Sequence, residues 1–72
     1  ANKQYDRAIA DFDKAIQLNP KYAAAYNNRG LAYENNGQLG EATAVFKIAL
    51  NLKPGHKKAE ENLKRVLARL EK

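Results

Sequence analysis

Apolar side chains recur every three or four residues in four stretches of the chain. These stretches span residues 5–18, 22–35, 39–52 and 56–70. Such spacing places apolar residues on one face of an α-helix and polar residues on the other. Pro20, Gly37 and Pro54 lie in the breaks, where proline cannot continue a helix and glycine can close one. The pattern predicts four helices joined by short turns, with residues 1–4 as the frayed remnant of a turn.

The chain also overlays on itself at a shift of 34 residues. Ten positions are identical in this overlay, and most are apolar or structural residues: Asn2/Asn36, Gln4/Gln38, Ala8/Ala42, Ala10/Ala44, Phe12/Phe46, Ala15/Ala49, Leu18/Leu52, Pro20/Pro54, Ala25/Ala59 and Asn28/Asn62. A fixed period of 20 to 50 residues is typical of a solenoid built from stacked repeats. The overlay therefore predicts a repeat protein.

The residues that carry the repeat form a recognisable motif. Their order and spacing, Tyr26, Gly30, Tyr33, Ala42, Phe46, Ala49 and Pro54, closely resemble the tetratricopeptide repeat. Tyr26 stands where that family most often has tryptophan, and Arg29 stands where leucine is usual; we expect Arg29 to keep its charged head in water. The resemblance implies an all-α, right-handed solenoid of antiparallel helical hairpins, with about four helices in one domain.

The resemblance also divides the chain. Residues 1–20 correspond to the second helix of a partial repeat, residues 21–54 to a complete repeat, and residues 55–72 to a capping helix. The apolar stripe of this last helix consists of Ala59, Leu63, Val66, Leu67 and Leu70. Its other face is polar, as the terminal helix of a solenoid requires.

Gly30 needs an explanation, because glycine inside a helix costs about 1 kcal/mol relative to alanine. We expect a close approach of the neighbouring helix, with the small residues Ala42 and Ala49 facing Gly30. A phosphate-binding role would need a glycine-rich loop, and none surrounds this residue.

The composition argues against catalysis. The chain has no cysteine, no serine, one threonine (Thr43) and one histidine (His56), whereas nucleophilic catalysis needs several convergent groups. We interpret His56 as a solvated loop residue, and Asp6, Asp11 and Asp13 as the polar face of a helix rather than a metal site. The sequence predicts no enzyme, no cofactor and no metal site. It does not indicate a compartment, and the cytoplasm is the default.

A binding surface is the more plausible functional feature. In the family, the first helix of each pair lines the concave side, which implies a peptide-binding groove formed by Asn27, Asn28, Glu34, Asn35, Lys58, Asn62, Arg65 and Arg69. The net charge of +5 favours an acidic peptide or a C-terminal carboxylate. Some family members hold acidic chaperone tails with lysines and asparagines. Asn28 and Lys58 match two of those positions, but Asn62 stands where the clamp has arginine, so the clamp is incomplete.

The first predicted helix lacks the partner that the repeat would place before it. The face formed by Ile9, Phe12 and Ile16 should then be exposed, and we expect self-association, hence a homo-oligomer, through it, or continuation into a longer array. A fragment or engineered repeat with a purely structural role is the alternative. A basic nucleic-acid binder is less favoured, because Tyr26 and Tyr33 belong to the packing stripe and leave few aromatic rings for base stacking.

Overall fold

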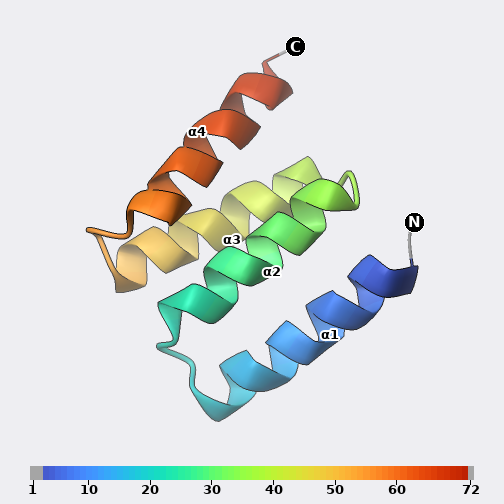
Figure 1. Cartoon of the computed structure of the whole chain (residues 1–72). Coiled ribbons are helices and arrows are strands. Elements are labelled where there is room, and N and C mark those ends of the chain that lie inside the picture. The colour runs from blue at the N-terminus through green and yellow to red at the C-terminus, as the bar shows by residue number, and fades with distance from the viewer. Residues whose placement is uncertain (1–2, 72) are drawn as a thin grey trace.

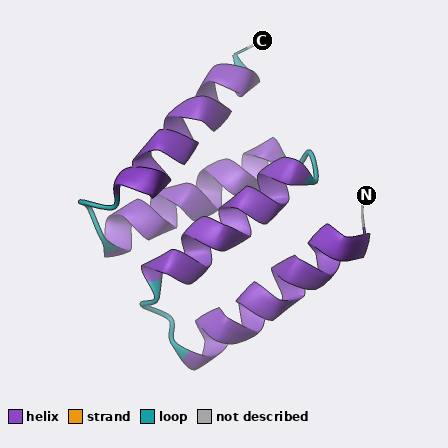
Figure 2. Ribbon diagram, in the orientation of Figure 1, coloured by secondary structure: helices purple, strands orange, loops and turns teal. Residues whose placement is uncertain are grey.

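The computed structural model describes residues 3–71 of the chain, and helices are the regular elements of this part (Figure 2). The helices are α1 (Lys3–Leu18), α2 (Ala23–Asn35), α3 (Leu39–Leu52) and α4 (Lys57–Leu70). The predicted all-α fold with four helices is confirmed. The prediction of a frayed start was wrong for Lys3 and Gln4, which lie in the first turn of α1. Ala1 and Asn2 lie outside the described residues.

Consecutive helices run antiparallel and are joined by short turns (Figure 1). α2 packs against both α1 and α3, and α4 packs against α3 and, less extensively, α2. α1 and α4 therefore occupy opposite ends of the stack. At the turn between α2 and α3, Gly37 has a φ of 83°, the left-handed conformation that glycine adopts without steric cost.

The core lies between α2, α3 and α4. Phe46 and Val66 are the largest side chains with no exposed surface, and Ala42 is buried with them. Partly buried apolar side chains pack around this cluster: Leu31, Tyr33, Leu39 and Leu63. The apolar stripe predicted for α4 is buried only in part, because Leu67 and Leu70 remain 39% and 49% exposed.

Gly30 lies where two helices approach each other closely. A Cβ atom added to Gly30 would lie 2.4 Å from the nearest ring carbon of Phe46, far inside van der Waals contact. The predicted close approach is present, but the ring of Phe46, rather than Ala42 or Ala49, is what meets Gly30. A helix-weakening glycine is kept here because any side chain would collide with the core aromatic.

His56 has a structural role that the sequence did not indicate. It is the N-cap of α4, and its Nδ1 accepts a hydrogen bond from the backbone N–H of Ala59 at 3.4 Å. The bond satisfies one of the N–H groups that have no partner within the first turn of a helix. His56 does lie in the loop before α4 and is partly exposed, so the interpretation as a loop residue was right in position but missed the capping role of its side chain.

Candidate interaction surface on α2 and α4

Two asparagines predicted to line the groove instead bond to each other. The Nδ2 atom of Asn62 on α4 donates to Oδ1 of Asn27 on α2 at 2.9 Å. Both residues are buried, at 4% and 8% exposure for Asn27 and Asn62. The pair joins the two helices and satisfies part of the hydrogen-bonding capacity of two buried amides, which would be costly to leave unpaired.

A second polar link joins the same helices further along. The carboxylate of Glu34, buried at 6% exposure, accepts two hydrogen bonds from Arg65 of α4: Nε lies 2.9 Å from Oε2 and an Nη atom lies 2.6 Å from Oε1. Arg69 adds a third, at 3.0 Å from Oε2. This paired arrangement is the geometry in which a guanidinium binds a carboxylate most strongly.

These contacts shift the titration of both partners. Hydrogen bonds from Arg65, with a smaller contribution from Arg69, lower the pKa of Glu34 below its ordinary value of 4.5, although burial acts in the opposite direction. The same hydrogen bond raises the pKa of Arg65. Glu34 is therefore ionised at neutral pH, and each arginine is held at a defined place on the surface.

The lowered pKa predicts an acid-dependent loss of stability. A carboxyl whose pKa is depressed by folding stabilises the native state above its unfolded pKa, and this contribution is lost as the pH falls through the folded value. Between pH 6 and pH 3, wild type should lose about 1–2 kcal/mol more unfolding free energy than Glu34→Gln, which has no charge to lose. Urea unfolding of both proteins across this range measures the difference. Equal pH slopes would contradict a stabilising role for the ionised Glu34.

The remaining predicted groove residues are accessible. Asn28, Asn35 and Lys58 are exposed, and the side chains of Arg65 and Arg69 are 47% and 50% exposed although they are anchored to Glu34. On α4, Lys58, Arg65 and Arg69 follow one another at spacings of seven and four, which places them on one helix face. The structure thus separates the predicted set into buried residues that join the helices and residues whose side chains remain exposed, with Arg65 and Arg69 doing both.

Arg29 is a structural residue, and its burial and its ion pair were not predicted from the sequence. Its side chain is only 19% exposed and forms an ion pair with Asp13 of α1. Its guanidinium carbon lies 5.6 and 5.8 Å from the ring centres of Tyr26 and Tyr33, within the range of cation–π attraction. The expectation that its charged head would lie in water was wrong. A usable signal was present in the sequence, namely an arginine flanked by tyrosines three residues before and four after.

Other kinds of site find little support in the part of the chain that the structure describes. Over residues 3–71, no three histidine, aspartate or glutamate side chains gather as a metal site would need. No helix within this range combines the length and the apolar character needed to cross a membrane.

The fold and this surface place the protein in the class of short helical solenoids. Some polar side chains of α2 and α4 join the two helices, and others are exposed along them. The family follows from comparison with known proteins. Residues 1–37 match the profile described as TPR repeat, and residues 23–56 match the one described as Tetratricopeptide repeat. The chain belongs to the tetratricopeptide repeat family, whose members are typically non-catalytic modules for protein–protein interaction.

Several curated proteins contain a similar stretch. Heat shock protein STI1 of Saccharomyces cerevisiae is 34% identical over 64 residues, which is 89% of this chain and 11% of that protein. The chloroplastic tetratricopeptide repeat domain-containing protein PYG7 of Arabidopsis thaliana is 41% identical over 54 residues, 75% of this chain and 18% of that protein. The peroxisomal targeting signal receptor of Candida glabrata is 35% identical over 63 residues, 88% and 11% respectively. The chain thus spans less than a fifth of each of these relatives.

Proposed function

We propose that the surface formed by α2 and α4 binds an acidic peptide, in extended or helical form, or an acidic C-terminus. The observation that carries this proposal is the pair of half-exposed arginines, Arg65 and Arg69, anchored on the buried carboxylate of Glu34. Arg65, Arg69 and the neighbouring Lys58 outnumber the carboxylates of Glu34 and of Glu61, which also acts on Arg65, so this part of the surface keeps a net positive charge. Ion pairing to Glu34 also restricts both side chains before a ligand arrives, which reduces the entropy lost on binding.

The neighbouring polar residues suit the same kind of ligand. Lys58 lies on the same face of α4 as the arginines and offers a further ammonium group. Asn28 is exposed on α2 and can both donate to and accept from a peptide backbone. The name of one relative also supports binding of a short signal, because the peroxisomal targeting signal receptor is by its name a receptor for a targeting signal.

The proposal predicts that Asn28 and Lys58 contribute directly to binding. A labelled pentapeptide of alternating aspartate and glutamate, with a free C-terminal carboxylate, is a suitable probe for fluorescence anisotropy. The double variant Asn28→Ala/Lys58→Ala should bind it at least about tenfold more weakly than wild type, since a charge-assisted hydrogen bond contributes about 1.5–3 kcal/mol. The same peptide with an amidated C-terminus tests whether the terminal carboxylate is part of the recognised group.

Lys47→Ala is the matched control, because Lys47 is exposed on α3 and its loss removes one positive charge away from the proposed surface. This variant should bind the pentapeptide almost as well as wild type. Equal weakening in Lys47→Ala and in the double variant would mean that only net charge matters, and it would contradict a defined site. Tighter, strongly salt-dependent binding of single-stranded RNA would instead favour the nucleic-acid alternative.

Association through α1 is a second candidate function, and the homo-oligomer expected from the sequence is its simplest form. The three residues expected to form the self-association face, Ile9, Phe12 and Ile16, are partly exposed. Phe12 is the equivalent of Phe46, which has no exposed surface. Exposed apolar area of this kind favours association, since burying a side chain such as phenylalanine contributes about 1.5–3 kcal/mol.

A further inference from the structure

The two ends of the helix stack are complementary under the internal repeat. A shift of 34 residues carries α1 onto α3 and α2 onto α4. α3 is covered by α2 on one side and by α4 on the other, whereas α1 contacts α2 alone among the described helices. Among the described helices, α1 is thus an α3-type helix that no α2-type helix covers on its outer side, and α4 is an α2-type helix that no α3-type helix covers on the corresponding side. Figure 1 shows these helices on opposite sides of the molecule.

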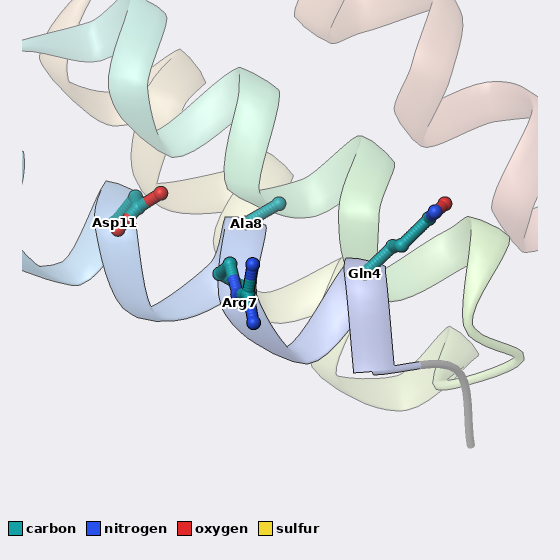
Figure 3. A pocket seen from close by; sticks show the side chains of 4 residues that line it. All are labelled: Gln4, Arg7, Ala8 and Asp11. Atoms are coloured by element: carbon teal, nitrogen blue, oxygen red, sulfur yellow. The ribbon is translucent and has the colours of Figure 1, made fainter.

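The burial of equivalent residues locates the uncovered face of α1. Ala42, Phe46 and Ala49 of α3 have no exposed surface, whereas their counterparts in α1 are partly exposed; these are Ala8, Phe12 and Ala15. The largest contrast is at Val45, which is 4% exposed, because its counterpart Asp11 is exposed. Gln4, Arg7, Ala8 and Asp11, all on α1, line an open hollow of about 280 Å³. Figure 3 shows these four side chains along the helix.

The face of α4 that corresponds to the α3-contacting face of α2 is also uncovered. Tyr26, Gly30 and Tyr33 of α2 have Glu60, Lys64 and Leu67 as their counterparts in α4. The Lys64 side chain is 76% exposed and pairs with Glu60 of the same helix at 3.4 Å. Leu67 and Leu70 add 39% and 49% exposed apolar side chains at the C-terminal half of α4.

From these features we infer that α4 of one copy docks on α1 of a second copy, head to tail, in the manner in which α2 covers α3. The inference deepens the second candidate function and names its partner. Each of the two faces carries both signs of charge, with Arg7 near Asp11 on α1 and Glu60 beside Lys64 on α4. One complementary pair among the departures from the internal pattern supports the docking. Lysine replaces Gly30 on the α2-type helix, and aspartate replaces Val45 on the α3-type helix. Lys64 of one copy can therefore pair with Asp11 of the next, while Leu67 covers Ala8 and Phe12.

The same substitutions determine the strength and form of this association. Gly30 lets α2 approach Phe46 closely, and a lysine at the equivalent place holds the docking helix further from Phe12. The contact should therefore be weaker than the α2–α3 contact and should weaken further with salt, because an exposed ion pair is screened. The two docking faces differ and lie at opposite ends, so association forms chains or rings of several copies rather than a two-fold symmetric dimer.

Charge reversal tests the pairing. Sedimentation equilibrium at low salt, over a wide concentration range, should show the wild-type mass rising above 8.1 kDa. Asp11→Lys places two lysines together at the junction and Lys64→Asp places two acidic residues together, so each variant alone should associate about tenfold more weakly. A mixture of the two variants should recover association, and so should the double variant Asp11→Lys/Lys64→Asp, because opposite charges meet again between copies. Both positions are exposed, and circular dichroism verifies that each variant keeps its helices.

Three results would overturn the inference. A single 8.1 kDa species at every wild-type concentration would exclude association. A loss of association in Asp11→Lys but not in Lys64→Asp would indicate a symmetric contact through α1 instead. Failure of the mixture to recover association would show that the two residues do not meet. Peptide binding provides a separate readout, because Asn28→Ala/Lys58→Ala should weaken peptide binding at least about tenfold without changing the mass distribution.

Discussion

Phe46→Ala is expected to destabilise the protein by about 3–5 kcal/mol, whereas Phe12→Ala should cost only about 1 kcal/mol. The two phenylalanines are equivalent in the repeat, but Phe46 has no exposed surface and packs with Ala42 and Val66. Phe12 is partly exposed on a helix with one neighbour. Truncation at Phe46 therefore leaves a cavity in the core, while truncation at Phe12 mainly removes area that water already reaches.

Urea unfolding followed by circular dichroism measures both variants. A domain of 72 residues has little stability to spare, so Phe46→Ala should be largely unfolded even without urea. Phe12→Ala should unfold cooperatively, close to wild type. Similar losses in the two variants at a concentration where the protein is monomeric would contradict the difference in packing. At higher concentrations, Phe12→Ala should also associate less than wild type, because Phe12 belongs to the proposed docking face.

Gly30→Ala is expected to destabilise the protein by about 1–3 kcal/mol although alanine is the better helix former. The added methyl group would lie 2.4, 2.7 and 2.9 Å from three ring carbons of Phe46. Because that ring is completely buried, it cannot swing into solvent, and α2 and α3 must separate. The cost of this displacement exceeds the helix-propensity gain of about 1 kcal/mol.

Gly40→Ala is the matched control for this prediction. Gly40 lies in the first turn of α3, and a Cβ atom added there would have no neighbour within 4 Å. The same chemical change should therefore leave stability unaltered or raise it by up to about 1 kcal/mol. The midpoints of urea unfolding compare the two variants directly. Gly30→Ala would contradict the packing argument if it were as stable as Gly40→Ala.

The helices and their order could be predicted from the sequence, because they depend on local properties. Apolar spacing and the proline and glycine breaks act within a few turns of chain, and the 34-residue period shows the same local pattern twice. These signals predicted both end residues of α3 correctly, and they predicted the ends of the other helices to within two residues. The small errors fall at helix starts. His56 caps α4 through its side chain, which apolar spacing does not reveal, and α1 begins at Lys3 although the first apolar residue of its stripe comes later.

The surface could be predicted only in part, because helix periodicity gives a face and not a partner. Asn27, Glu34 and Asn62 were placed correctly on the helices that meet. Whether each side chain faces solvent or the opposite helix depends on how α4 crosses α2. Arg65 offers an example, since an acidic residue lies four positions before it in sequence, at Glu61, yet its guanidinium binds Glu34 of another helix.

What the sequence by itself determined is the repeat, and with it the all-α solenoid and the family. These follow from residue types at fixed spacings, which constrain backbone conformation and the face that must be buried. Only the tertiary structure decided which residues at equivalent positions of the repeat are equally buried. Phe46 and Phe12 share a position in the repeat, but one is enclosed by three helices and the other meets a single neighbour. Burial depends on what lies across from a residue, and no spacing within one helix specifies that.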